Sequence, residues 1–304
     1  MNATVNRRCS DPEAMGLEWR EGSSCLDRDC LTAKRIHTQP DPATATVFDR
    51  GFDPHVPNAA RIYDYLLGGK DNYAADQLVA QRMLAIAPDT RMLAWFSRQF
   101  LIRCVEDALD EGIWQFIDLG AGIPISPAVH EVAQKCDPLG ARVLSVDYDP
   151  MVFAHANAMI PEDPAVRSVL GDLRDPLLID QLRDEKVVDF DQPVAVMCVG
   201  VLHHIMDGEC PGEILGRFRK ALAPNSVLAV THGSSDSDRD FVESVIRDTA
   251  CSTAAFRLRS DDEIVALLDD FEILPPGVVT IQDRLGGDLP PTTFRIVGGM
   301  CYVP

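Results

Sequence analysis

The chain has 304 residues, 46% hydrophobic and 25% charged, a composition typical of a globular protein large enough for a full α/β core with a smaller appended segment. It carries 28 Lys and Arg residues against 47 Asp and Glu residues, a formal charge of -19. This excess of negative charge repels phosphate polymers and anionic membranes. We therefore expect neither nucleic acid nor a membrane as a partner, although a small nucleotide is not excluded.

The nine cysteines are odd in number and scattered, without CxxC spacing or a paired Cys/His set. This pattern favours reduced thiols over disulfides or a zinc site, and we expect no metal. Arg7 and Arg8 are not followed by an apolar run, and no stretch of about 18 apolar residues occurs. These features predict a cytoplasmic protein.

The first half of the chain divides into a polar stretch and a helical one. Residues 1–50 show neither helical nor strand periodicity, which predicts a disordered tail. Residues 51–112 form an expected helical cap or lid segment, with helices over 58–67 and 73–86 and a longer one between Pro88 and Gly112. Met92, Phe96 and Phe100 are expected on one face of this longer helix.

Residues 113–304 show short apolar runs that alternate with amphipathic segments of helix length, a pattern typical of βαβ units. The expected parallel strands are 115–119, 142–146, 166–170, 194–199 and 227–230, with helices starting near prolines 127, 150, 176 and 211. Ser260 and Glu263 form a capping box. Two later runs, 271–274 and 293–297, lack an intervening helix and predict an antiparallel edge hairpin. The fold class is therefore α/β: a Rossmann-like, doubly wound, mostly parallel sheet of about seven strands, preceded by helices.

The first expected strand runs into the sequence Asp-Leu-Gly-Ala-Gly at residues 118–122. Glycines at this place let the chain turn sharply and let a ligand lie against the backbone, at the crevice where open α/β sheets bind ligands. The third glycine of a dinucleotide fingerprint is missing, because Ile125 occupies its place and Pro124 precedes it. The turn thus favours a cofactor without a pyrophosphate.

Carboxylates follow the next two strands. Asp147 ends the second strand and suits the two hydroxyls of a ribose, whereas Asp149, before Pro150, is more simply a helix cap. Asp172 follows the third strand and could accept from an adenine amino group, with Leu173 covering the ring; its alternative role is that of a turn residue. Together the three strand ends predict a site for a nucleoside.

These motifs resemble those of class I methyltransferases. More narrowly, the chain resembles an actinobacterial family of S-adenosylmethionine-dependent methyltransferases, long known as a domain of unknown function. The sequence Asn-Ala-Ala-Arg-Ile-Tyr-Asp-Tyr-Leu-Leu-Gly-Gly-Lys-Asp-Asn-Tyr at residues 58–73 carries this resemblance. Segments 129–134, 172–176 and 195–203 add to it, and it extends from about Phe52 to about Val279. The resemblance implies the fold and S-adenosylmethionine as cofactor, with S-adenosylhomocysteine as product, but names no acceptor.

The implied cofactor assigns expected roles to further residues. Asp118 suits its ammonium group, while its carboxylate could meet backbone donors at Gly120, Ala121 and Gly122, or Arg61 or Lys70 if the N-terminal segment folds over it. Tyr63 and Tyr65 could place an aromatic face near the sulfonium. Core packing for one tyrosine and a solvated Lys70 are the alternatives. The remaining residues expected to bind the cofactor are Tyr148 and Gly200.

His203 and His204 follow the fourth strand, where the acceptor would sit. In an extended chain they point opposite ways and cannot easily share a metal. His203 is a candidate base or acceptor-orienting group, and Tyr63 is a second catalytic candidate; the alternative for His203 is a buried, hydrogen-bonded histidine.

The sequence thus predicts a methyltransferase that acts on a small-molecule acceptor. A cofactor-binding module without catalysis and a nicotinamide-dependent oxidoreductase are the alternatives, the second disfavoured by the missing glycine. The sequence does not indicate an oligomeric state.

Overall fold

The computed structural model of the protein describes residues 53–137, 140–160, 162–249 and 255–304. The disordered tail expected over residues 1–50 lies outside the described residues. The three helices expected before the sheet are present as α2 (Ala59–Leu66), α3 (Ala74–Ile86) and α4 (Thr90–Asp110). Asn58 begins α2 because its side-chain oxygen accepts from the backbone N–H of Ala60 at 2.8 Å.

The sheet has the strand order β3-β2-β1-β4-β5-β8-β6, with β7 also paired to β8. The five parallel strands were all expected, within one to three residues at each end. Their bounds are β1 Gln115–Leu119, β2 Arg142–Asp147, β3 Val166–Leu170, β4 Ala195–Cys198 and β5 Val227–Gly233. Strands β1 and β4 are parallel neighbours, and the order of the strands along the chain reverses between them. Their carboxyl ends therefore flank the crevice expected of a doubly wound fold.

The antiparallel edge is confirmed, although the two strands are not joined by a tight hairpin turn. Strand β8 (Ile296–Tyr302) inserts between β5 and β6 (Glu272–Ile273) and runs antiparallel to both. Between β6 and β8 the chain forms β7 (Val279–Thr280) and α11 (Ile281–Leu285). The sequence analysis missed α11 because it comprises only five residues, which is too short for a helical period to be recognised.

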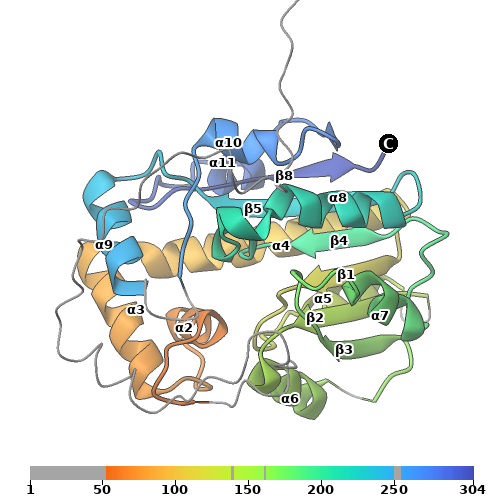
Figure 1. Ribbon diagram of the computed structural model, residues 1–304, viewed down its shortest axis with the longest axis horizontal. Helices are drawn as coiled ribbons and strands as arrows, with labels where there is room; N and C mark the ends of the chain where they lie inside the picture. Colours follow the sequence, from red (N-terminus) through yellow and green to blue (C-terminus); the bar gives the residue numbers. More distant parts are fainter. Residues whose placement is uncertain (1–52, 138–139, 161, 250–254) are drawn as a thin grey trace, which may run out of the picture. The chain divides into compact units, whose positions relative to one another are not determined.

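Successive side chains along each strand point to opposite faces of the sheet and pack into two separate hydrophobic cores. On one face, Phe116 and Met197 pack with α4 and α5 (Val129–Cys136). On the other, Ile117 and Val196 pack with α7 (Leu178–Asp184) and α8 (Pro211–Ala221). Helix α6 (Pro150–Met159) contacts β2 and β3. Figure 1 shows α4 running across the sheet, with α7 and α8 on the opposite side.

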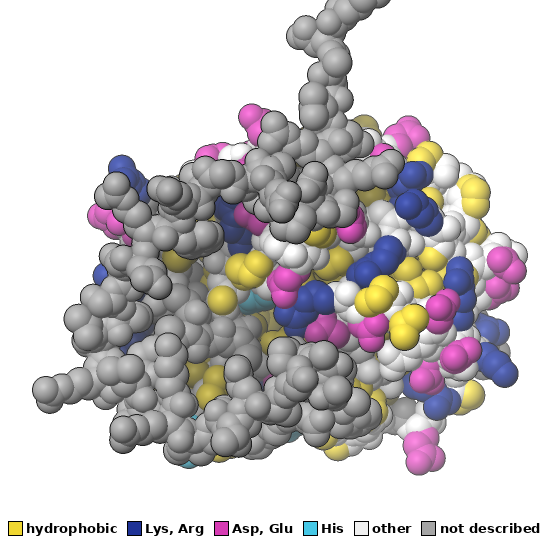
Figure 2. Space-filling view, in the orientation of Figure 1, with side chains coloured by type: hydrophobic (Ala, Val, Ile, Leu, Met, Phe, Trp, Pro, Cys, Tyr) yellow, Lys and Arg dark blue, Asp and Glu magenta, His cyan; other side chains and the backbone are white. Residues whose placement is uncertain are grey.

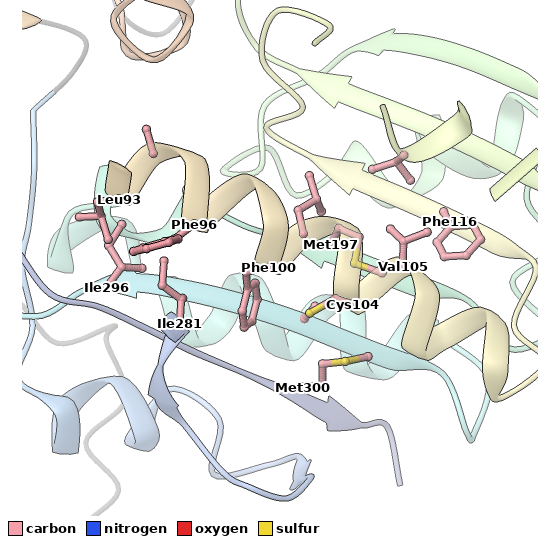
Figure 3. Packing of buried hydrophobic residues seen from close by; sticks show 14 of the residues in the cluster. Leu93, Phe96, Phe100, Cys104, Val105, Phe116, Met197, Ile281, Ile296 and Met300 are labelled. Atoms are coloured by element: carbon pink, nitrogen blue, oxygen red, sulfur yellow. The ribbon is translucent and has the colours of Figure 1, made fainter. Parts of the chain in front are cut away.

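Helix α4 is the main packing element of the first core. Leu93, Phe96, Phe100 and Cys104 recur every three or four residues and are buried, whereas Met92 is only half-buried. Figure 3 shows this row of side chains facing Met300 and the other labelled residues of β8 and α11. Helix α4 is therefore anchored to β4, β5 and β8, and it positions the side chains that lie beyond the strand ends.

Two shorter helices complete the described chain. Helix α9 (Arg239–Thr249) follows β5, and α10 (Asp261–Ala266) begins at the expected capping box, in which the backbone N–H of Glu263 donates to Ser260 Oγ at 3.2 Å. Within the described residues, no helix is both long enough and apolar enough to cross a membrane. On the part of the surface that Figure 2 shows uncovered, acidic and basic side chains are intermingled.

Candidate active site

A large cavity lies at the carboxyl ends of β1, β2, β3 and β4, beneath α2 and α4. It encloses about 1630 Å³ of space that no atom occupies, part of it open to solvent. Most of the residues expected from sequence line it, namely Tyr63, Asp118, Gly120, Ala121, Gly122, Asp147, Tyr148, Asp172, Leu173, Gly200 and His203. Arg61, Tyr65 and Lys70 are not among its lining residues.

The glycine turn after β1 is held by the neighbouring strand. Gly120 and Gly122 have φ of +65° and +67°, a region that side chains other than glycine rarely adopt. The N–H groups of Gly120 and Ala121 donate to the carbonyl oxygen of Val146 at 2.7 and 3.1 Å, and that of Gly122 donates to Asp147 Oδ2 at 2.9 Å. All three donors are engaged within the protein, so the expectation that they meet a cofactor carboxylate is not supported.

Asp147 is 8% exposed and sits where β2 meets the cavity. Burial raises the pKa of this carboxyl to about 6, while hydrogen bonds from backbone N–H groups, including those of Asp149 and Gly122, oppose the shift. The Asp149 N–H donates to Oδ1 at 3.0 Å and that of Gly122 donates to Oδ2. The backbone N–H of Tyr148 is a third donor to this carboxylate. A carboxylate has about four acceptor directions, so Asp147 can still accept a hydrogen bond from a ligand hydroxyl.

Arg98 is a site residue that sequence reasoning missed. It projects from α4 to the cavity wall near Asp118, and its Nη2 contacts the carbonyl oxygens of Ile125 and Pro127. Its Nε is buried and has no hydrogen-bond partner in the described part of the chain. An arginine on a helix that precedes the glycine turn by about 20 residues carries no local motif, so only the fold reveals this role.

Asp118 faces Arg98 across the same corner. Burial raises the pKa of Asp118 to about 7; the Arg98 guanidinium lowers it and the Asp147 carboxylate raises it further. A buried carboxylate without a bound cation favours its protonated form. The charge of an ionised Asp118 is therefore only partly balanced by the protein. A ligand that brings both an ammonium and a carboxylate group would complement Asp118 and Arg98 together.

Asp172 is tightly paired rather than free. Its Oδ1 and Oδ2 accept from Arg174 Nε and Nη2 at 2.8 and 2.7 Å, and Oδ1 also accepts from the Arg174 backbone N–H at 3.0 Å. The last contact is the turn geometry that was the alternative for Asp172. Arg174 in turn lies 5.6 Å from the ring centroid of Tyr148, so these three residues form one wall of the cavity.

Three of the residues expected at the cofactor do not line the cavity. Arg61 is buried and its Nε donates to Asp76 Oδ2 at 2.8 Å. The Tyr65 ring lies 5.0 Å from the Arg91 guanidinium, and Lys70 is exposed. We therefore leave Arg61, Tyr65 and Lys70 out of the cofactor site.

His203 and His204 lie in a single turn of 3-10 helix, Leu202–His204, and not in the extended chain assumed from sequence. Their ring centroids are therefore only 4.5 Å apart, and His203 stacks on Phe256 at 4.9 Å with an interplanar angle of 11°. His203 is 6% exposed, and neither of its ring nitrogens has a hydrogen-bond partner among the described residues. Burial lowers its pKa well below the ordinary value, so the ring is neutral near pH 7.

The neighbours of His203 are satisfied, which distinguishes them from it. His204 Nδ1 lies 3.0 Å from the Ala255 carbonyl oxygen, and His232 Nε2 lies 2.8 Å from Arg259 Nη1. Burial lowers the pKa of both His204 and His232 to about 4.

Tyr63, the second catalytic candidate, has its hydroxyl engaged. This hydroxyl donates to the Ala94 carbonyl oxygen at 2.9 Å, and burial raises its pKa to about 12. Tyr63 therefore does not act as a base near neutral pH.

Comparison with known families supports the cofactor chemistry that this geometry indicates. Residues 46–299 match the family described as S-adenosyl methyltransferase. The chain belongs to this family. Its cofactor is therefore S-adenosylmethionine, as the sequence motifs implied. Comparison with curated proteins gives no match.

Two solved structures resemble this methyltransferase over most of its length. A protein of the DUF574 family from Streptomyces avermitilis is 30% identical, with a TM-score of 0.76 over 83% of this chain and 99% of that one. A candidate methyltransferase from Thermobifida fusca is 33% identical, with a TM-score of 0.75 over 84% of this chain and 97% of that one. The family expected from residues 58–73 is thereby confirmed.

The cavity of the methyltransferase fits its cofactor chemically. The orphaned Nε of Arg98 and the carboxyl of Asp118 suit an amino-acid end, and Asp147 suits a ribose. Gly200 has φ of +77°, and a Cβ added there would meet no atom within 4 Å, so the backbone borders open space. These protein groups are therefore complementary to a nucleoside that carries both an ammonium and a carboxylate group.

Proposed function

We propose that this methyltransferase acts on a small molecule that occupies the same cavity as the cofactor, beneath α2, α3 and α4. The observation that carries the proposal is the continuity of the cavity, which residues of the strand ends and of these helices line together. The cavity thus extends from the strand ends, where we place the cofactor, to the helices, so cofactor and acceptor can lie side by side in it.

In this proposal each part of the cofactor has its own partners. Asp147 accepts from the ribose hydroxyls, Asp118 and Arg98 hold the ammonium and carboxylate groups, and Leu173 with Tyr148 borders the base. Gly120, Ala121, Gly122 and Gly200 border the ligand with their backbone. At Gly122 and Gly200 a Cβ would make no close contact within the protein, so the ligand can approach the chain there. Asp172 shapes this wall through Arg174.

The bound cofactor supplies an electrophilic methyl group that is already activated as a sulfonium. What the chain must provide is alignment of the acceptor, which can contribute about 7–11 kcal/mol in favourable cases. His203 is the candidate group for orienting the acceptor or accepting its proton, because it is neutral, lines the cavity and has no hydrogen-bond partner in the described part of the chain. The Tyr63 hydroxyl is bonded to the Ala94 carbonyl oxygen, so we assign Tyr63 a structural role in the cavity wall.

We further propose that residues 51–112 act as a fixed cap over the acceptor. The cap is tied to the sheet domain by a hydrogen bond of 2.6 Å from Asn58 Nδ2 to Asp149 Oδ2. The net charge of -19 disfavours nucleic acid as the acceptor, and the cysteine pattern favours the cytoplasm as the location.

The test is titration of the pure protein with S-adenosylhomocysteine, followed by incubation with methyl-labelled cofactor and extract of the producing cell. We expect calorimetric binding and a label in the low-mass fraction. Failure to bind S-adenosylhomocysteine would refute the site. Label confined to protein or nucleic acid would refute the small-molecule acceptor, and binding without any transfer would favour a module that only senses the cofactor.

A further inference from the structure

Charge is unevenly distributed in the cavity. Its ionic lining residues are Arg98, Asp118, Asp147, Asp172 and Arg174, which gather around the strand ends and the glycine turn. The rest of the lining comes from α2, α3 and α4 and from residues near the end of the chain. We call this second part the acceptor chamber and define it by Ile62, Leu66, Met83, Leu93, Phe256 and Phe294.

Among the described residues, the acceptor chamber offers no ionic partner to a ligand. None of its defining residues is charged, and the polar groups beside it are already bonded, as for Tyr63 with the Ala94 carbonyl oxygen. An ionised carboxylate or ammonium group moved into such surroundings loses its hydration without compensation. Apolar surface, in contrast, gains free energy when it is buried there.

His203 provides one unsatisfied polar group at the border of the chamber. It is stacked on Phe256, more than nine-tenths buried, and without a hydrogen-bond partner for either nitrogen among the described residues. The adjacent His204 is half-buried, and its Nδ1 lies 3.0 Å from the Ala255 carbonyl oxygen. A neutral imidazole has one acceptor nitrogen, so a ligand hydroxyl is a matching donor.

We propose that the acceptor is an uncharged, mainly apolar compound of aromatic size that carries a hydroxyl group, which donates a hydrogen bond to His203. This inference rests on the proposed function and narrows it to one substrate class. It follows from the separation of charge in the cavity and from the unpaired imidazole of His203 at the border of the chamber.

The test uses matched probes that differ only in charge, bound to the full chain saturated with S-adenosylhomocysteine. The probes are 1-naphthol, 1-naphthoate and 1-naphthylmethylammonium, with phenol, benzoate and benzylammonium as a smaller set. We expect the better of the two hydroxyl probes to bind at least about tenfold more tightly than either charged probe of its own size. A charged probe that binds equally well, or no binding by either hydroxyl probe, would overturn the proposal.

A second measurement isolates His203 without relying on turnover. In the wild type, 1-naphthol should bind more tightly than naphthalene, and the His203→Leu substitution should remove this preference while naphthalene still binds. His204→Leu is the matched control, in which the preference should persist. If His203→Leu keeps the preference, His203 does not recognise the hydroxyl. Binding of S-adenosylhomocysteine is measured first. If the protein does not bind it, the proposed function itself is refuted. If the protein binds it but prefers the charged probes, only the substrate class is refuted.

Discussion

Asn58 Nδ2 donates to Asp149 Oδ2 across 2.6 Å, and both residues are N-caps. Asn58 caps α2, while Asp149 Oδ1 accepts from the Met151 N–H at 2.7 Å and so caps α6. Asp149 follows Asp147 by two residues in the sheet domain. The contact therefore fixes the cap segment beside the carboxylate that we assign to the ribose.

Replacing Asn58 tests this link. Asn58→Ala removes a helix cap and a buried hydrogen bond, so we expect the free energy of unfolding to fall by about 1–3 kcal/mol in urea titration and S-adenosylhomocysteine binding to weaken. Thr280→Ala, which removes the cap of α11 outside the cavity, should lower stability alone. Equal effects of both variants on binding would contradict a specific role for Asn58.

Asp147→Asn should weaken S-adenosylhomocysteine binding by about 10–100-fold, because an amide presents one acceptor oxygen where the carboxylate presents two. The fold should persist, as judged by circular dichroism, since the strand itself is held by its neighbours. Asp175→Asn, which alters an exposed turn near α7, serves as the control. Unchanged affinity in Asp147→Asn would show that the ribose lies elsewhere.

The Arg98→Met substitution distinguishes recognition of the amino-acid end of the cofactor from recognition of its adenosine end. We expect about 10–100-fold weaker binding of S-adenosylhomocysteine but unchanged binding of adenosine, which lacks the amino-acid end. Arg103→Met, on the same helix but paired with Asp107 on the surface, should affect neither ligand. Equal loss of both ligands in Arg98→Met would indicate that Arg98 merely supports the loop at Ile125 and Pro127.

The pH dependence of binding reports on Asp118. Burial holds its pKa at about 7 in the empty site, where Arg98 and Asp147 are the charged groups that face it. A bound ammonium group favours the ionised carboxylate and lowers this pKa, so affinity is lost as pH falls through about 7 and regained as pH rises. Calorimetry in buffers of different ionisation enthalpy should show proton release on binding near pH 6.5.

Asp118→Asn provides the control for this titration. It should bind more weakly at pH 8 and lose most of the pH dependence between pH 6 and 8. The part that remains should match adenosine, which senses Asp147 but carries no ammonium group. A profile for S-adenosylhomocysteine that is flat in the wild type would contradict the pairing with Asp118.

Substitution by alanine should change the free energy of unfolding in opposite directions at two glycines. A Cβ at Gly298 of β8 would lie 2.7 Å from the Val230 carbonyl oxygen and 3.0 Å from Phe100 Cζ, so Gly298→Ala should destabilise the fold by about 1–3 kcal/mol. At Gly216, inside α8, a Cβ meets nothing within 4 Å, and Gly216→Ala should add up to about 1 kcal/mol. Urea unfolding of both variants measures the difference.

The sequence was sufficient to predict the parallel sheet because each of its strands is a short apolar run next to a turn signal. Asp147 and the glycine turn could be placed because parallel strands bring their carboxyl ends to one edge. The Asp149 cap was also readable, since it precedes a proline at the first helical position. These features are all local, which is why one sequence reveals them.

Predictions that depended on long-range contacts were less successful. Arg61 and Lys70 were expected at the cofactor, but Arg61 pairs with Asp76, a residue that sequence reasoning did not connect to it. Arg98 was missed because its role arises only when α4 packs across the sheet. The place of β8 between β5 and β6 was equally hidden, because strand order is set by packing between distant segments.

The division of the cavity has an evolutionary consequence. Groups that we assign to the cofactor fall mostly within residues 118–174, whereas the acceptor chamber is built from residues 62–93 and 256–294. Descendants of one ancestral gene can therefore keep the methyl donor and diversify what they modify, by changes in two stretches that flank the inherited centre. We expect sequence drift among relatives to be greatest at residues 83–93 and 256–294, because residues 62–73 belong to the motif that identifies the family.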